Sequence, residues 1–203
     1  MAEVDRPGAR ETRGDLHPRL ATARIQLQPV SVSDYDRLRQ IELSENLGAL
    51  WRCGGSTPSP EAWAHGLSAG VLAQFLVVRA NDQVPVGIVA CYKADFQHQF
   101  AYLAAAKFVR ADRTTHLMEA TVLFIEYLFS CWAFRKLYLE VNGYNLEQFS
   151  SGVGRLLEEE GRPSEHVYFG GRYWDQHLLS LWRDRWEESA LPRLIKTGGT
   201  FSS

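Results

Sequence analysis

The segment 110–116, Arg-Ala-Asp-Arg-Thr-Thr-His, places side chains that can bind phosphate directly before a helical pattern. Apolar residues at helical spacing follow it over 117–134. The amino terminus of a helix has free N–H groups and the positive end of the dipole, which together bind anions. A cation there, such as protonated His116, opposes the dipole unless an anion is bound. The presence of His116 at this helix start therefore favours an anionic ligand there. The candidate residues are Arg110, Arg113, Thr114, Thr115 and His116.

Three side chains later in the chain are candidates for general base catalysis. Glu140 lies on the polar face of an alternating strand pattern over 137–142. Asp175 and His177 are two residues apart in the last strand pattern, so both side chains are expected on one face of a sheet. A hydrogen bond between strands is the alternative role for each of these two residues. His98 falls in a turn and is expected only to be exposed.

One amide and several aromatic residues are candidates for substrate contacts. Asn145 follows the strand pattern of 137–142, where its side chain could contact a ligand or cap the next helix. Most aromatic side chains are expected in the core, because aromatics fill cores more often than sites. Trp51, Tyr92 and Tyr173 are the residues predicted to line an acceptor pocket near the irregular segment 44–60.

The elements that must position these residues alternate between strand and helix periodicity. Strands are expected over 24–30, 74–79, 84–92, 100–109, 137–142, 156–169 and 173–182. Helices are expected after Ser33, after Ser59 with Pro60 at its first position, over 117–134, and from Asn145 to about Gly152. This order predicts an α+β domain around a mixed sheet.

Length and composition are those of one folded domain. The chain has 203 residues, 45% of them hydrophobic, and a net charge of −2, which lacks the basic bias of a dedicated nucleic-acid binder. Residues 1–23 and 196–203 are polar and aperiodic, so both are predicted to be disordered tails around a domain at 24–195. No apolar run reaches the about 20 residues of a membrane span, and no signal peptide is recognised; a cytoplasmic protein is expected.

The three cysteines form no CxxC pair and lie near no histidine at metal-ligand spacing, so no metal is expected. Cys91 and Cys131 lie in apolar runs and are expected to be small buried residues.

An ordered set of motifs over residues 24–187 resembles the GNAT superfamily of N-acyltransferases, and within it the branch of ribosomal-protein alanine acetyltransferases. The motifs are Leu27-Gln28-Pro29-Val30 with Asp34-Tyr35-Asp36-Arg37-Leu38, Pro85-Val86-Gly87-Ile88, Glu119-Ala120 with Phe129 and Trp132, Lys136-Leu137-Tyr138-Leu139-Glu140-Val141 with Asn145, and Gly161-Arg162, His166-Val167-Tyr168 and Gly171-Arg172-Tyr173-Trp174-Asp175.

The resemblance implies a GNAT-like α+β fold with a mixed, mostly antiparallel sheet, in which helices flank a splayed pair of parallel strands. An acyl thioester would lie in the splay, with acetyl-CoA the first expectation as co-substrate. Its pyrophosphate would contact the loop 110–116. Ala106, Phe108 and Asn145 would contact the donor, and a backbone N–H within 104–107 would stabilise the oxyanion.

The chain departs from the family pattern at the phosphate-binding loop. Arg113 and Thr115 stand where glycines are expected, although the leading Arg110 is present. No carboxylate lies on the strand 100–107, and Gly152 stands where many relatives have a tyrosine.

Three functions follow from the resemblance. The first is an acyltransferase that moves an acyl group from acyl-CoA to the amine of a small molecule or peptide by direct attack. The second is the same fold with an acyl carrier protein or an aminoacyl-tRNA as donor, as in natural-product biosynthesis. The third is a non-catalytic domain that binds a ligand. We expect the chain to be either a monomer or a homodimer.

Overall fold

The computed structural model describes residues 18–44, 52–109, 115–149 and 152–191. Its main sheet has seven strands in the order β1-β2-β3-β4-β5-β9-β6. The strands are β1 Ile25–Pro29, β2 Val71–Arg79, β3 Pro85–Asp95, β4 Phe100–Lys107, β5 Lys136–Asn142, β6 Glu158–Gly161 and β9 Gln176–Trp182. Strands β7 Val167–Phe169 and β8 Arg172–Trp174 form a separate hairpin. The helices are η2 Val32–Asp34, α1 Tyr35–Glu42, α2 Pro60–Ser68, α3 His116–Cys131, η3 Gly143–Phe149 and α4 Arg183–Glu188.

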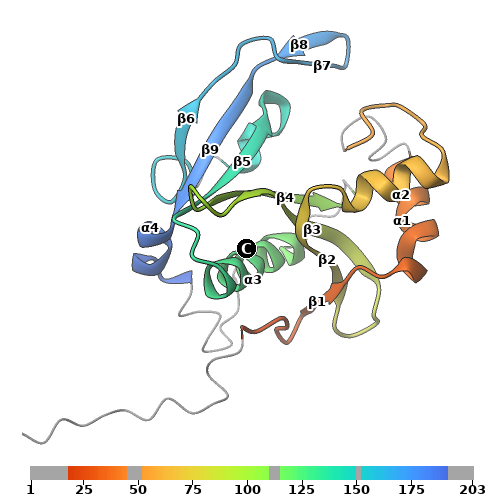
Figure 1. The fold of residues 1–203 in the computed structure, drawn as a ribbon, viewed down its shortest axis with the longest axis horizontal. Coiled ribbons are helices and arrows are strands. Elements are labelled where there is room, and N and C mark those ends of the chain that lie inside the picture. The colour runs from red at the N-terminus through yellow and green to blue at the C-terminus, as the bar shows by residue number, and fades with distance from the viewer. Residues whose placement is uncertain (1–17, 45–51, 110–114, 150–151, 192–203) are drawn as a thin grey trace, which may run out of the picture.

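Helices cover both faces of the main sheet (Figure 1). One face carries α3, which packs on alternate residues of the strands such as Val89, Leu103 and Leu137. The other face carries α1 and α2, which pack on the intervening residues, for example Ile88 and Ala106. This alternation follows from the period of two in a strand and divides the core into two clusters.

All strand pairs of the main sheet are antiparallel except β4 and β5, which are parallel. The predicted α+β fold with a mixed, mostly antiparallel sheet flanked by helices is therefore confirmed. Helix α3 makes the connection between the two parallel strands, as a parallel crossover requires.

Gly87 allows α3 to begin close to the sheet. A Cβ built on this residue would lie 2.7 Å from the carbonyl oxygen of Ala106 and 3.0 Å from Cδ1 of Leu117. Since Leu117 is in the first turn of α3, a side chain at position 87 would push this turn away from β3 and β4.

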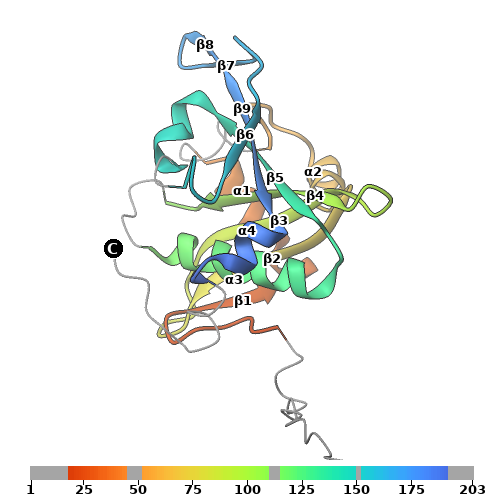
Figure 2. The ribbon, with the colours of Figure 1, turned by 90° about the vertical axis from the view of Figure 1, so that its left-hand side faces the viewer.

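Several element boundaries differ from those predicted. The strand pattern over 156–169 forms two strands with a break at residues 162–166, where Pro163 has no N–H for a strand ladder. The β7–β8 hairpin that follows the break projects beyond the end of the main sheet (Figure 2). The segment after β5 forms a 3₁₀ helix from Gly143 instead of a helix that begins at Asn145.

The predicted burial of Cys131 is wrong, whereas that of Cys91 is confirmed. Helix α3 ends at Cys131 instead of continuing to residue 134, and its last residue is exposed. Cys91, on β3, is fully buried against α3.

Most of the predicted tails lie outside the described residues, so the domain limits stay a prediction. The described end of the first tail contacts the domain: Ala21 forms a bridge with Gln26, and Leu20 packs against the core. No described helix is long and apolar enough to cross a membrane.

Candidate active site

The parallel strands β4 and β5 separate part of the way along their length. They pair only at Phe100↔Lys136, Ala101↔Leu137 and Tyr102↔Tyr138. Beyond Tyr102, β4 continues to Lys107 with β3 on one edge and no pairing to β5 on the other among the described residues. Ala105 is exposed although β4 is a central strand. The two halves of the sheet diverge from this point (Figure 1), which leaves backbone groups on an open edge inside the sheet.

The amino terminus of α3 lies past the carboxyl end of β4. Thr115 is its N-cap, and the Thr115 hydroxyl accepts a hydrogen bond of 3.1 Å from the Arg24 guanidinium. Arg24 also lies 3.5 Å from the buried carboxylate of Glu119, which accepts a further hydrogen bond from the Thr22 hydroxyl. A cation from the start of β1 therefore stands beside the positive end of the α3 dipole. Of the loop residues predicted to bind the donor, Thr115 and His116 are described, and Arg110, Arg113 and Thr114 lie outside the described residues.

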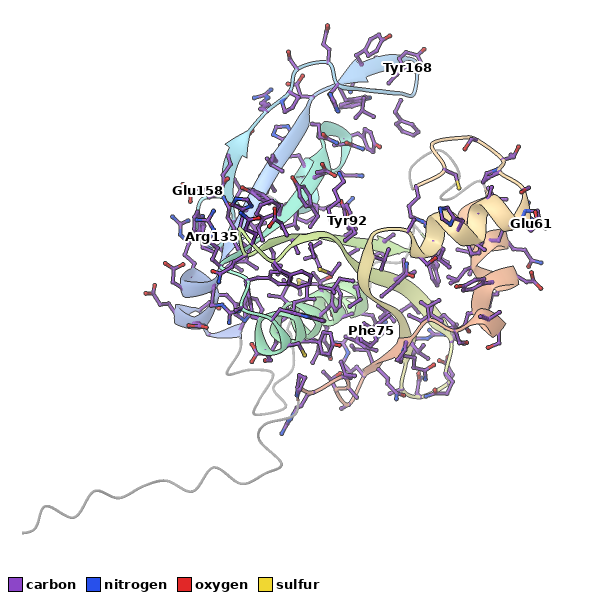
Figure 3. The ribbon with its side chains drawn as sticks, viewed as in Figure 1. Glu61, Phe75, Tyr92, Arg135, Glu158 and Tyr168 are labelled. Atoms are coloured by element: carbon purple, nitrogen blue, oxygen red, sulfur yellow. The ribbon has the colours of Figure 1, made fainter. Side chains whose placement is uncertain are left out.

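Three tyrosines lie in a row where the splay begins. Tyr92 on β3 is opposite Tyr102 on β4, which is opposite Tyr138 on β5. Their ring centroids are 5.7 Å apart for the first pair and 5.2 Å apart for the second. All three are half-buried on the sheet face that carries α1 and α2. We call Tyr92, Tyr102 and Tyr138 the tyrosine row; Tyr92 lies near the centre of the molecule (Figure 3).

Glu140 extends the tyrosine row into the splay. It follows Tyr138 by two residues on β5, so both side chains point to the same face. The Tyr92 hydroxyl donates a hydrogen bond of 3.1 Å to Glu140 Oε2, and Lys93 Nζ lies 3.5 Å from Glu140 Oε1. Burial, together with the negative charge of Glu140, raises the pKa of Tyr92 well above its usual value. The Tyr92 hydroxyl therefore stays protonated and acts as a donor to the carboxylate.

A second cation and carboxylate lie at the closed end of the splay. Lys136 donates hydrogen bonds to both carboxylate oxygens of Glu160, at 2.9 and 2.8 Å, and the Tyr138 hydroxyl donates another at 2.9 Å. Burial disfavours both charges, yet these hydrogen bonds outweigh it: the pKa of Lys136 is raised and that of Glu160 is lowered. This pair links β5 to β6 across β9, and the hydrogen bond from Tyr138 connects it to the tyrosine row.

The structure does not bring Asp175 and His177 to Glu140. His177 is opposite Val141 in the β5–β9 register, so its side chain lies on the α3 face, away from Glu140. There His177 Nδ1 is 2.9 Å from a carboxylate oxygen of Glu159. Asp175 precedes β9 and accepts from the backbone N–H of Glu165 and from the Arg162 guanidinium, and these two contacts lower its pKa.

Asp175, His177 and Tyr173 instead share a pocket of about 390 Å³ at the carboxyl end of β5. Asn145 lies on η3 beside this pocket, and its side-chain oxygen accepts a hydrogen bond of 3.4 Å from Gln148. Tyr173 is 62% exposed on the projecting hairpin, far along the chain from Tyr92, and Trp51 lies outside the described residues.

Ala106 and Phe108, both predicted to contact the donor, have buried side chains. They pack against α1 and α2, so only their backbone groups could face the splay.

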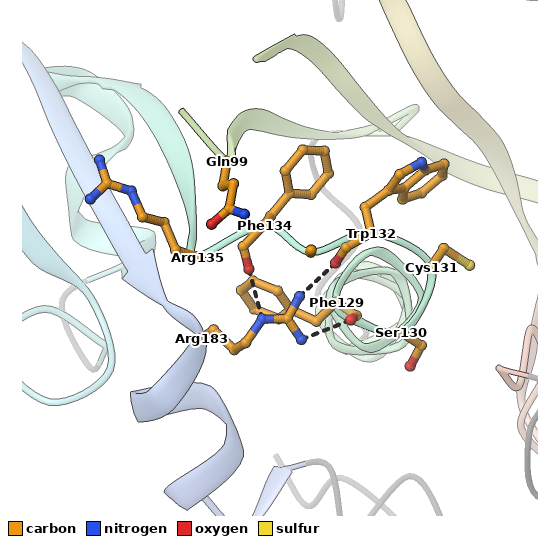
Figure 4. Close-up of a pocket in the computed structure, with 9 residues that line it drawn as sticks. Gln99, Phe129, Ser130, Cys131, Trp132, Phe134, Arg135 and Arg183 are labelled. Carbon is orange, nitrogen blue, oxygen red and sulfur yellow. Dashed lines mark hydrogen bonds between the residues drawn. The ribbon is translucent and has the colours of Figure 1, made fainter. Parts of the chain in front are cut away.

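A larger pocket, of about 580 Å³, lies at the other end of α3 (Figure 4). Its centre is the Arg183 guanidinium, which donates to the carbonyl oxygens of Phe129, Trp132 and Phe134. The bonds to Phe129 and Trp132 satisfy carbonyl groups that the end of a helix leaves unpaired, and Phe134 lies just beyond the helix. Arg183 therefore stabilises the end of α3, and Cys131 is one of the residues that line the pocket.

Four residues of the site were absent from the sequence-based candidates: Arg24, Lys93, Tyr102 and Tyr138. The tyrosines carried a usable signal, because 102 and 138 both fall on the polar phase of strands expected to be parallel neighbours. Nothing local indicated Arg24, which lies 91 residues before its partner Thr115.

The sequence matches no protein-family model and no curated protein. Solved structures are similar to the fold. A spermidine N-acetyltransferase from Vibrio cholerae, in complex with CoA and spermine, is 16% identical with a TM-score of 0.62, over 81% of this chain and 98% of that one. A GNAT-family acetyltransferase from Bacillus anthracis is 13% identical with a TM-score of 0.63, over the same shares. A chimera of the Vibrio cholerae enzyme and hSSAT reaches a TM-score of 0.64 at 15% identity, over 81% and 99%. The chain therefore has the fold of the GNAT acetyltransferases.

Proposed function

We propose that this chain is an N-acyltransferase that moves an acyl group, most simply acetyl, from acyl-CoA to the amine of a small molecule by direct attack. The observation that carries the proposal is the position of Glu140, a carboxylate held by Tyr92 at the point where β4 and β5 separate. The similar Vibrio cholerae structure supports the proposal, because it holds CoA, which matches the proposed donor, and spermine, which is an amine like the proposed acceptor.

The donor would occupy the open edge of β4. Its pantetheine amides can form hydrogen bonds with the backbone groups of residues 103–107, as a neighbouring strand would in a closed sheet. The pyrophosphate would then reach the amino terminus of α3, where Thr115, His116 and Arg24 supply donors and positive charge. These side chains can take over part of the role that glycine N–H groups play in the family's usual loop.

Glu140 would act as the general base. It takes a proton from the acceptor's ammonium, and the amine nitrogen then attacks the thioester carbonyl carbon. A backbone N–H on the open edge of β4 stabilises the resulting oxyanion. The tetrahedral intermediate collapses as the C–S bond breaks; the attached nitrogen releases its extra proton to form the amide, and the sulfur takes up this proton and leaves as a thiol. Asp175 and His177 have carboxylate partners or ion pairs of their own, so we assign them to positioning the hairpin and β9.

Neither described thiol near α3 is placed to form an acyl-enzyme intermediate. Burial raises the pKa of Cys91 to about 12, so it stays a thiol. Cys131 lies at the opposite end of α3 from the helix start. Direct attack therefore fits the structure better than a covalent intermediate.

The donor site is tested by filling the splay. Ala105→Trp places a large side chain at the open edge of β4, and Ala62→Trp adds the same bulk to the exposed surface of α2 as a control. Calorimetric titration with CoA is expected to give micromolar binding for the wild type and for Ala62→Trp, and at least a tenfold loss for Ala105→Trp. Equal affinities for CoA in all three proteins would show that CoA does not bind in the splay. No binding at millimolar CoA would favour a carrier protein or an aminoacyl-tRNA as donor.

A further inference from the structure

Lys93 reaches the tyrosine row through an irregularity in β3. Consecutive residues of a regular strand point to opposite faces, so a lysine next to Tyr92 should point toward α3. The β3–β4 register shifts between Tyr92 and Asp95, and Lys93 has a φ of +48°, in the left-handed region that a non-glycine residue rarely adopts. The shift places the Lys93 side chain on the same face as Tyr92.

The Lys93 ammonium lies in a site suited to an alkylammonium ion. Its nitrogen is 4.9 Å from the ring centroid of Tyr102, 5.6 Å from that of Tyr92 and 3.5 Å from Glu140 Oε1. Ring faces and a carboxylate are the groups that bind substituted ammonium ions. The site stands at the last β4–β5 pair, Tyr102↔Tyr138, beside the start of the splay.

The hold on Lys93 is weak in comparison with the hold on Lys136. Lys136 is 8% exposed, lies 4.5 Å from the Tyr138 ring and 4.7 Å from the Trp182 ring, and bonds to both oxygens of Glu160. Lys93 is 61% exposed and lies too far from Glu140 for a short hydrogen bond. Lys136 is therefore fixed in the sheet, whereas the Lys93 side chain can leave its site for water.

We propose that Tyr92, Tyr102 and Glu140 form the recognition site for the acceptor's alkylammonium group, and that Lys93 occupies this site until the acceptor displaces it. The inference rests on the proposed function for the identity of the ligand as an acceptor. It goes further in naming the three residues that bind the protonated amine and the side chain that competes with it. The carboxylate that binds the ammonium is then the one that takes its proton.

Competition by Lys93 has a measurable size. When a side chain of the protein fills a site for most of the time, the apparent affinity for an added ligand is the intrinsic affinity multiplied by the fraction of time that the site is empty. An exposed cation–π contact and a surface ion pair together favour the filled state about three- to tenfold. Removal of the lysine head group should therefore strengthen ammonium binding by about that factor.

The test measures binding without any donor, so its outcome does not depend on acyl transfer. Tyrosine ring signals of the full chain are followed by NMR during titration with n-butylammonium, and with 1-butanol as the uncharged probe of the same length. Lys93→Ala is compared with Arg185→Gln, which removes a surface cation paired to one carboxylate, Glu158, at 3.4 Å on the distant helix α4. Because Lys93 is exposed, the substitution should leave the fold intact.

The expected result is a three- to tenfold lower Kd for n-butylammonium in Lys93→Ala, no such change in Arg185→Gln, and no saturable binding of 1-butanol. Adding Tyr102→Leu to Lys93→Ala should reverse the gain. An unchanged or higher Kd in Lys93→Ala would overturn the inference, as would equal gains in both single variants. If Lys93→Ala binds n-butylammonium as expected but no donor supports acyl transfer, the recognition site stands and the proposed function fails.

Discussion

The Tyr92 hydroxyl donates a hydrogen bond to Glu140 Oε2 at 3.1 Å, and this bond links β3 to β5 across β4 where the sheet opens. The two residues are 48 positions apart in the chain. The bond holds the carboxylate at the edge of the splay, where the proposed base would meet the incoming amine. Its removal should therefore affect the reaction more than the fold.

Replacing Tyr92 with Phe removes this hydrogen bond and keeps the ring of the tyrosine row. A hydrogen bond to a charged group contributes about 1.5–3 kcal/mol, so a carboxylate without it should position the amine less well. We expect kcat to fall about 10- to 100-fold, with the Kd for CoA unchanged. Steady-state kinetics and calorimetry with CoA measure the two quantities. A loss of CoA affinity with unchanged kcat would place Tyr92 in the donor site instead.

Replacing Gly87 with Ala should move the first turn of α3. The added Cβ meets the carbonyl oxygen of Ala106 at 2.7 Å, and this backbone atom cannot yield without displacing β4. Overpacking of this kind costs about 1–3 kcal/mol, so thermal unfolding should occur at lower temperature and CoA should bind more weakly.

Gly66 is the matched control for this change. It lies in α2 with no atom within 4 Å of an added Cβ. Gly66→Ala should raise the unfolding free energy by about 0.5–1 kcal/mol, since alanine is the better helix former. Equal destabilisation by the two substitutions would show that contact with Ala106 is not the cause.

The pair of Lys136 and Glu160 should stabilise the sheet through mutual hydrogen bonds. Lys136→Met leaves the Glu160 carboxylate, which is 26% exposed, without its main partner. We expect a loss of about 1–3 kcal/mol in unfolding free energy from urea titration. Adding Glu160→Gln should recover part of that loss, because the uncompensated charge is gone. If the double variant is less stable than the sum of both single losses predicts, the two residues do not act as a pair.

The buried Cys91 thiol should make stability depend on alkaline pH. Its pKa in the folded chain is raised to about 12, above that of an exposed thiol, so the unfolded chain releases the proton first as pH rises. The stabilising contribution is complete below the unfolded pKa, near pH 8.5, and is lost between there and about pH 12. The urea concentration at the unfolding midpoint should decrease between pH 7.5 and pH 10.5, and this decrease should be larger in the wild type than in Cys91→Ala. Parallel falls in the two proteins would assign the pH dependence to other groups.

The fold could be predicted from the sequence because its signals are local and repeated. Alternation in Leu137, Leu139 and Val141 against Tyr138 and Glu140 predicts β5 and its two faces, and the structure has both. The resemblance to the GNAT superfamily implied a parallel pair of strands, and the structure has it between β4 and β5. Glu140 was therefore placed correctly on the polar face near the splay.

Side chains that reach the site from irregular or distant backbone could not be predicted in this way. Lys93 lies on the face of Tyr92 only because β3 is irregular there, and alternation would place it on the opposite face. Asp175 and His177 have the spacing of a shared face, but Asp175 lies before β9 begins, and the register of β9 directs His177 to the α3 face, away from Glu140. The exposure of Cys131 depends on where α3 ends, and three carbonyl contacts to the distant Arg183 stabilise that end.

The most direct test of the account compares acyl transfer by the wild type and by Glu140→Gln, with acetyl-CoA and n-butylamine at pH 7.5. Glutamine keeps the size of the side chain and can still accept from Tyr92, but it cannot take a proton. Release of CoA thiol and mass of the acetylated amine are followed together. The account predicts turnover by the wild type and a kcat at least 100-fold lower in Glu140→Gln, with the same Kd for CoA. Equal turnover by both proteins would contradict the role of Glu140, and absence of turnover by the wild type with every amine tried would contradict the transferase itself.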